Sequence, residues 1–319
     1  MEKRVLVITG PTATGKSALG VALAKRLDGE ILSADSMQVY RRLDIGTAKV
    51  TSAEMQGVPH HLLDVAEPNE TFSAARWVAA AAECAEDVFA RGKVPILVGG
   101  TGLYIDSLLS GRDFAESGAG EVRAALSAEY DRIGGEAFRE QLRAVDPERA
   151  EKLHPADKKR LVRALEVFRL TGETISAHDE KTKALPQRWP SLRIALTYAD
   201  REALYARIDR RVEEMAAAGL FEETARLLEG GLDAESTAMQ AIGYKESVDY
   251  LEGRCTRAAA IEAIARASRR YAKRQLTWLR RDPVVHWIAW AGAPDIPAAA
   301  DEVAALWQQS TDADKEEKR

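Results

Sequence analysis

A glycine-rich stretch near the start of the chain has the residue types and the spacing of a phosphate-binding loop. It is GPTATGKS, in which Gly10, Gly15, Lys16 and Ser17 stand at the diagnostic positions. Glycines allow backbone N–H groups to turn inward around an anion, and the first turn of a following helix adds partial positive charge. Lys16 supplies a mobile cation, and Ser17 offers a hydroxyl ligand to Mg²⁺, which we expect as the cofactor. The residues expected to hold a diphosphate are Gly10, Pro11, Thr12, Ala13, Thr14, Gly15, Lys16 and Ser17.

The loop does not specify the molecule to which the diphosphate is attached. ATP is the usual ligand, and it would make the protein a kinase or another nucleotide-cleaving enzyme. Such enzymes usually hold Mg²⁺ with an acid at the end of a core strand. Here the apolar run at 94–98 is followed by Gly99, Gly100, Thr101 and Gly102, with no acid. The missing acid argues against the ATP hypothesis.

Two other side chains follow predicted strands and are candidates for chemistry. Asp35 follows the run at 30–34, and the carboxyl ends of parallel strands border the ligand crevice of an open sheet. It is therefore a candidate general base, a candidate metal ligand through water, or a turn-forming residue. Thr101, which stands among three glycines, either fits a tight turn or donates its hydroxyl to a closely approaching ligand.

Basic residues gather in three parts of the chain although the net charge is −5. Residues 254–281 carry nine Lys or Arg and one acid, Glu262. Five of these bases fall near one face of a helix, namely Arg266, Arg270, Lys273, Arg274 and Arg281. The other clusters lie at 158–163 and 201–211. A solvated helix face would explain one cluster, whereas three clusters exceed what a small nucleotide needs and indicate a polyanion such as RNA.

Hydrophobic patterning predicts an α/β fold built on a parallel sheet, as in the P-loop NTPases. Strands are expected at 5–8, 30–34 and 94–98. The helices expected between them span 16–27 and a segment that begins at Thr71 or Ser73 and ends near Gly92. Such alternation of strand and helix is typical of parallel sheets.

The pattern changes near residue 111 and divides the chain. Nearly everything from there to about 191 is helical in pattern, a strand returns at 191–199, and helix follows to about 281. We expect a catalytic core of residues 1–111 and 191–310, a helical insertion of residues 112–190, and a flexible polar tail of residues 311–319.

Composition argues against several classes of protein. Cys84 and Cys255 are far apart and form no C-x-x-C pair, so neither a zinc ribbon nor a disulfide framework is predicted. The adjacent His60 and His61 have no carboxylates at ligand spacing and are expected in a loop or in packing. The first apolar run is too short for a signal peptide or a membrane span. We expect a soluble, cytoplasmic protein with no membrane contact.

Together these motifs resemble those of the bacterial tRNA dimethylallyltransferases, also called tRNA isopentenyltransferases. The resemblance runs from residue 5 to about 281 and is carried by GPTATGKS, SADSMQVYRRLDIGTAK, GVPHHLLD, LVGGTGLYI, KKRLVRALEVFRLTG, MQAIGYKE and AKRQLTWLRR. It implies transfer of a dimethylallyl group from dimethylallyl diphosphate to N6 of adenosine 37 in tRNAs that read codons beginning with U. Thr14 stands where the family more often has Ser, and the zinc finger of many eukaryotic relatives is absent. The alternatives are a small-molecule kinase, a nucleotide-sensing module and an adenylate isopentenyltransferase, none of which needs a large basic insertion.

The resemblance also implies roles for individual residues. Asp35 would act as the base on the adenine amine, while Lys16, Arg207 and Mg²⁺ on Ser17 would neutralise the departing diphosphate. Thr101 would donate to the bridging oxygen or hold the adenine. The insertion would grip the anticodon stem of tRNA, and the protein is expected to act as a monomer. The residues expected to contact tRNA are Asp35, Ser36, Met37, Gln38, Thr101, Arg123, Lys159, Arg160, Leu161, Val162, Arg163, Gln240, Ala241, Ile242, Gly243, Tyr244 and Lys245.

Overall fold

The structure is a computed structural model that describes residues 3–111, 114 and 120–316. The chain divides into two compact units. The sheet unit comprises Met1–Leu108 and Trp189–Arg319, and the helical unit comprises Leu109–Arg188. The boundaries expected from the sequence, at 111/112 and 190/191, lie close to these.

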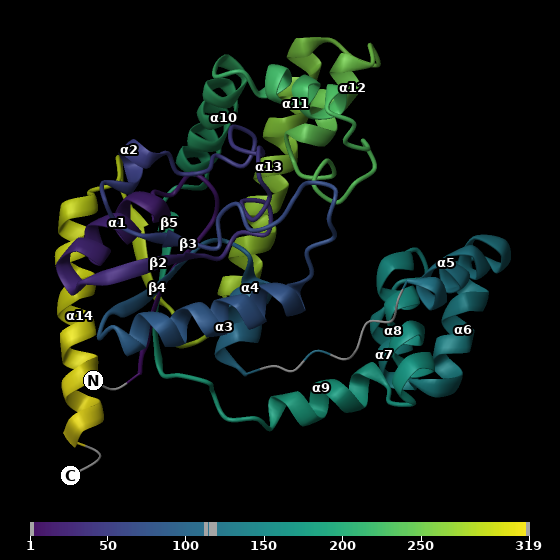
Figure 1. Ribbon diagram of the computed structural model, residues 1–319, viewed down its shortest axis with the longest axis horizontal. Helices are drawn as coiled ribbons and strands as arrows, with labels where there is room; N and C mark the ends of the chain where they lie inside the picture. Colours follow the sequence, from purple (N-terminus) through teal and green to yellow (C-terminus); the bar gives the residue numbers. More distant parts are fainter. Residues whose placement is uncertain (1–2, 112–113, 115–119, 317–319) are drawn as a thin grey trace. The chain divides into compact units, whose positions relative to one another are not determined.

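The sheet unit is built on a six-stranded parallel sheet with the order β3-β2-β4-β1-β5-β6 (Figure 1). Every residue of β1, β2 and β4 is buried, because central parallel strands carry helices on both faces. The predicted α/β class with a parallel sheet is thereby confirmed. The strands are β1 (Val5–Thr9), β2 (Gly29–Ser33), β3 (His60–His61), β4 (Val94–Val98), β5 (Ser191–Tyr198) and β6 (His286–Trp290).

Helices cover both faces of the sheet because two right-handed crossovers run along it in opposite directions. Helix α1 (Lys16–Leu27) connects β1 to β2, whereas α3 (Ala74–Ala90) leads from β3 back to β4. Ser73 is the N-cap of α3, and its hydroxyl accepts the Arg76 N–H. The last helix, α14 (Ile296–Glu316), packs beside α1. The other helices of this part of the chain are α2 (Ser52–Met55), α4 (Gly102–Leu109), α10 (Arg201–Ala217), α11 (Leu220–Glu229), α12 (Tyr244–Leu251) and α13 (Arg257–Leu279).

Two edge strands and the last helix differ from the sequence expectations. His60 and His61 were expected in a loop or in packing, yet they form the short strand β3, and β6 was not predicted. Residues 311–316 continue α14 where a flexible tail was expected, and residues 317–319 of that tail lie outside the described residues. None of the helices in the described chain is both long and apolar enough to cross a membrane.

Five helices in the described residues of the helical unit bury one apolar cluster. Leu126 from α5, Phe138 and Leu142 from α6, and Leu161 and Leu165 from α8 meet in that cluster. Asp157 caps α8 by accepting the Arg160 N–H, and Gly172 ends it in a left-handed conformation, with a φ of 71°. The helices are α5 (Glu121–Ile133), α6 (Gly135–Val145), α7 (Pro147–Lys152), α8 (Lys158–Thr171) and α9 (Ile175–Lys183).

The turn that follows β4 passes very close to the end of β2. A Cβ atom on Gly99 would lie 2.2 Å from the carbonyl oxygen of Ala34, which is far inside van der Waals contact. Backbone hydrogen bonds fix the approach, because Gly99 donates to Ile8 and Ala34 donates to Val98. Glycine therefore allows the segment that carries Asp35 to lie against the turn that carries Thr101.

We expect Gly99→Ala to lower the free energy of unfolding by about 2–3 kcal/mol, because the added methyl group forces two backbone segments apart. Urea denaturation measures the change. Gly292→Ala is the control, since no atom lies within 4 Å of the place that its added methyl group would occupy, and it should stay within about 0.5 kcal/mol of wild type. Equal stabilities for the two variants would contradict the close approach.

Candidate active site

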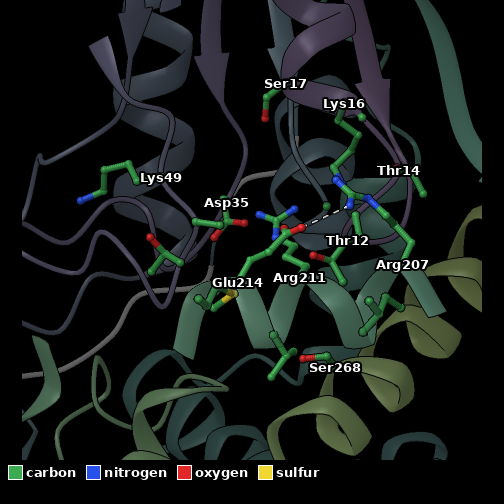
Figure 2. A pocket seen from close by; sticks show the side chains of 18 of the residues that line it. Thr12, Thr14, Lys16, Ser17, Asp35, Lys49, Arg207, Arg211, Glu214 and Ser268 are labelled. Carbon is green, nitrogen blue, oxygen red and sulfur yellow. Dashed lines mark ion pairs between the residues drawn. The ribbon is translucent and has the colours of Figure 1, made fainter. Parts of the chain in front are cut away.

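The carboxyl ends of five strands surround one large cavity in the sheet unit. Its volume is about 1460 Å³, and it is lined by the segments that follow β1, β2, β4 and β6 and by Tyr198 at the end of β5. Helices α10 and α13 close the opposite side (Figure 2). This is the position at which open parallel sheets bind their ligands.

The phosphate-binding loop forms one wall of the cavity. Gly15 has a φ of 88°, and the first turn of α1 has neither a capping side chain nor an acid, so its N–H groups face the cavity unopposed. The expected residues from Thr12 to Ser17 all line the cavity. Gly10 and Pro11 are not among the lining residues in the described chain. Gly10 packs on the Leu196 backbone, and the Pro11 carbonyl accepts from Lys16 Nζ at 2.6 Å.

Contacts from distant parts of the chain hold this loop in shape. Gln275 of α13 accepts the Thr12 N–H at 3.3 Å and donates to the Gly100 carbonyl at 3.0 Å. Trp290 at the end of β6 donates its indole N–H to the Thr14 carbonyl at 3.0 Å. The loop after β1 is therefore tied to the turn after β4 and to the last strand.

Three cations face the cavity beside the loop. Burial, and then the charge of Arg211, lower the pKa of Lys16 to about 7, although Asp35 opposes the shift. Burial likewise lowers the pKa of Arg211. Arg207, one turn earlier on α10, lies 3.6 Å from the Glu214 carboxylate. The sequence predicted that Arg207 neutralises a diphosphate and placed Arg211 in a basic cluster. The four-residue spacing between them puts both on one face of a helix, and this spacing indicates that Arg211 lies beside Arg207.

Asp35 lies between the loop and the far wall of the cavity in Figure 2. Its Oδ1 atom accepts the N–H groups of Met37 at 2.9 Å and Gln38 at 3.4 Å, which forms a turn. No described residue donates a hydrogen bond to Oδ2. One carboxylate oxygen thus shapes the backbone, and the other is available to a ligand.

Thr101 supports the Asp35 segment from behind. It is not among the described residues that line the cavity, and its hydroxyl accepts the Ser36 N–H at 3.1 Å. The same hydroxyl interacts with Tyr271, whose pKa is raised to about 12 by burial and by Asp35. Tyr271 lines the cavity and was not identified from the sequence. The structure therefore connects Thr101 to the cavity through these two neighbours.

The expected RNA-binding residues of the sheet unit differ in whether they line the cavity. Ser36, Met37 and Gln38 line the cavity, and so do the residues Gln240, Ala241 and Ile242 before α12. The Gln38 amide donates to the carbonyls of Thr47 and Ala48, so it is used within the protein. Lys245 is exposed.

Tyr244 and Gly243 are different from the rest of this segment. Tyr244 is fully buried and its hydroxyl donates to Glu223, so an RNA contact of its side chain is excluded by burial. Gly243 is buried and is the N-cap of α12, with a φ of 102°.

The expected RNA-binding residues of the helical unit lie on α5 and α8, with different exposure. Leu161 and Val162 are buried in the apolar cluster, so their predicted contact with RNA is wrong at the level of the side chains. Arg123 and Arg163 each lie 2.8 Å from the buried Glu166 carboxylate. Lys159 is exposed, as is Arg160, which pairs with Asp157.

The basic cluster of α13 divides between the cavity and solvent. Ser268, Tyr271 and Gln275 line the cavity together with Arg274. Arg266, Arg270, Lys273 and Arg281 are exposed. No group of three His, Cys, Asp or Glu side chains suited to a metal ion occurs in the part of the chain that the structure describes.

The fold and the cavity define an α/β protein with a parallel sheet, whose chain is interrupted by a helical unit. A sequence model of the IPP transferase family matches residues 38–282. The chain belongs to this family, and the resemblance derived from its motifs is confirmed.

Relatives and solved structures agree over nearly the whole chain. The chain is 49% identical over 287 residues to tRNA dimethylallyltransferase 1 of Pelobacter propionicus, covering 90% of this chain and 93% of that protein. It is similar to the full-length tRNA isopentenylpyrophosphate transferase of Bacillus halodurans, with a TM-score of 0.72, 38% identity and coverage of 98% and 100%. A eukaryotic dimethylallyltransferase acting on tRNA gives a TM-score of 0.78 at 29% identity, with coverage of 90% and 74%.

Replacing Lys16 with Met tests the burial of its charge. The pKa of about 7 lies below the ordinary 10.5, so the unfolded chain binds this proton more tightly than the native protein does. The ammonium group therefore destabilises the fold fully below about pH 7, and the penalty fades as the pH rises toward about 10.5. We expect Lys16→Met to raise the free energy of unfolding most at about pH 6 and least above about pH 10.

Urea denaturation across this pH range measures the effect. Lys25→Met on the exposed side of the same helix is the matched control, and its effect should not follow this pH dependence. A stability gain for Lys16→Met that is constant with pH would show that burial does not hold the lysine in its neutral form.

Proposed function

We propose that this protein transfers a dimethylallyl group from dimethylallyl diphosphate to N6 of adenosine 37 in tRNAs that read codons beginning with U. The observation that carries the proposal is the pairing, within one cavity, of an anion-binding loop with a carboxylate that keeps one oxygen available. The names of the relatives, which are tRNA dimethylallyltransferases, support the same donor and acceptor.

The cavity provides both halves of such a substitution. The amine of adenine is a weak nucleophile because its lone pair is delocalised into the ring. As the new C–N bond forms and the C1–O bond of the donor breaks, Oδ2 of Asp35 accepts the proton from nitrogen. The bonding electrons leave with the diphosphate, whose charge Lys16, Arg207 and Arg211 neutralise. Carbon is the centre attacked, and no phosphorus–oxygen bond of the donor breaks.

Magnesium fits this site as a partner of the diphosphate. The Ser17 hydroxyl is exposed at the cavity wall beside Lys16. Mg²⁺ commonly takes few protein ligands and completes its shell with phosphate oxygens and water, which agrees with the lack of an acidic cluster among the described residues. When bound, it would add positive charge against the leaving diphosphate.

The tRNA is expected to bind exposed basic side chains of both units. Lys159 and Arg160 on α8 and Arg266, Arg270 and Lys273 on α13 are exposed bases suited to phosphates. The acceptor base must leave its stack to reach a cavity of this kind. We further propose that the reaction takes place in the cytoplasm and that the protein acts as a monomer.

Replacing Asp35 with Asn tests the assignment of the base. The amide oxygen can still accept the Met37 N–H, so the turn is kept while the proton acceptor is lost. We expect kcat to fall by roughly 10²–10⁴-fold with tRNA affinity unchanged. Transfer of label from radioactive dimethylallyl diphosphate to unmodified tRNA measures turnover.

Glu54→Gln, which changes another acid of the same cavity, is the control for the loss of one negative charge. An Asp35→Asn enzyme with wild-type turnover would show that another group removes the proton. Label entering AMP but not tRNA, or phosphate transfer from ATP, would overturn the proposed function itself.

Replacing Lys159 with Ala tests the use of α8 in RNA binding. Lys159 is exposed, and the slope of log K against log salt should decrease in magnitude by about 1 if it neutralises one phosphate. Filter binding of tRNA at several salt concentrations measures the slope. Lys152→Ala removes a lysine already paired with Glu148 and should leave the slope near wild type. Equal slopes for the wild type and Lys159→Ala would limit Lys159 to a solvated surface.

A further inference from the structure

One wall of the cavity is an irregular segment between β2 and α2. We call residues 44–49 the wall loop, and all six of them line the cavity. The loop lies among residues in left-handed conformations, with a φ of 65° at Arg42 and 45° at Ala48. Non-glycine residues rarely adopt this conformation unless the surroundings impose it. Hydrogen bonds within the loop support this shape, since Ala48 donates to Ile45 and Lys49 donates to Asp44.

Glu223 of α11 holds the first half of the wall loop from behind. Its Oε1 accepts the N–H of Ile45 at 3.1 Å and of Gly46 at 3.2 Å, and its Oε2 accepts the N–H of Asp44 at 3.2 Å. The Tyr244 hydroxyl donates to Oε1 at 2.5 Å. Glu223 is only 6% exposed and is not among the described residues that line the cavity.

Among the described residues, these four donors are the hydrogen-bond partners of the Glu223 carboxylate. None of the described cations forms an ion pair with it, so backbone N–H groups and one hydroxyl replace its hydration. A buried carboxylate that lost such donors would carry a large desolvation penalty. The same penalty opposes any movement of Asp44, Ile45 and Gly46 away from the carboxylate.

Tyr244 connects the wall loop to a second lining segment. A Cβ atom on Gly46 would lie 2.4 Å from its ring, so the loop backbone packs directly on the ring. Tyr244 begins α12 immediately after the segment in which Gln240, Ala241 and Ile242 line the cavity. The position of one lining segment is thus fixed by that of the other.

Both the wall loop and the phosphate loop line the cavity. In Figure 2, Asp35 stands between Lys49 of the wall loop and Lys16 of the phosphate loop. If the diphosphate occupies the Lys16 side, the amine that gives its proton to Asp35 approaches from the Lys49 side. We infer that Glu223 and Tyr244 are positioning residues for the acceptor nucleobase, because they hold the surface against which it lies. This inference rests on the proposed function.

The experiment separates the two sides of the cavity. We expect Glu223→Gln to accelerate amide hydrogen exchange at residues 44–46, since the NH2 group that replaces one carboxylate oxygen cannot accept from these N–H groups. The value of kcat/KM for tRNA should fall roughly tenfold or more, while the Kd for inorganic pyrophosphate stays within about twofold of wild type. Glu222→Gln, which removes the neighbouring exposed charge, should leave the amide exchange at residues 44–46, kcat/KM for tRNA and the Kd for pyrophosphate unchanged.

Tyr244→Phe keeps the ring against Gly46 but removes one donor, and it serves if Glu223→Gln does not fold. It should reduce kcat/KM for tRNA by a smaller factor, again without weakening pyrophosphate. The inference is overturned if either variant keeps wild-type kcat/KM for tRNA, or if pyrophosphate binding weakens in parallel, which would indicate a general structural role. A wild-type protein that transfers no dimethylallyl group would instead refute the proposed function.

Discussion

Like charges held together at the carboxyl ends of parallel strands are the constraint on which the rest of the cavity depends. Burial, and then repulsion from Arg211, lower the pKa of Lys16 to about 7, and the charge of Asp35 opposes the shift only in part. Arg207 adds a third cation on the same helix face. A multivalent anion, as in the proposed function, would relieve this repulsion.

Buried amide and carboxylate groups from the second half of the chain keep the irregular backbone around this charge in place. Gln275 joins the phosphate loop to the Gly100 turn, and Glu223 holds the wall loop. Both bind backbone groups of these loops. The loops after the strands therefore depend on α11 and α13 for their conformation. The basic helix α13 combines two roles, with exposed bases on one side and a structural glutamine on the other.

The parts of the fold predicted from sequence are those that local pattern determines. Continuous apolar runs indicated β1, β2 and β4, and glycine spacing indicated the phosphate loop, because in each case the cause lies within a few residues. The edge strands β3 and β6 were missed, since His60–His61 is too short for any periodicity and pairing alone defines it. Leu161, Val162 and Tyr244 were assigned to RNA from their motifs, although a motif does not specify which face of a helix is buried. The spacing of Leu161 and Leu165 on α8 would have indicated the apolar face.

The indole of Trp290 reaches across 276 residues to the Thr14 carbonyl. The loop that gives the chain its earliest recognisable motif is thus completed by one of its last strands. During synthesis on the ribosome, the emerging amino-terminal half therefore lacks this hydrogen bond, which forms only after β6 has joined the sheet beside β5.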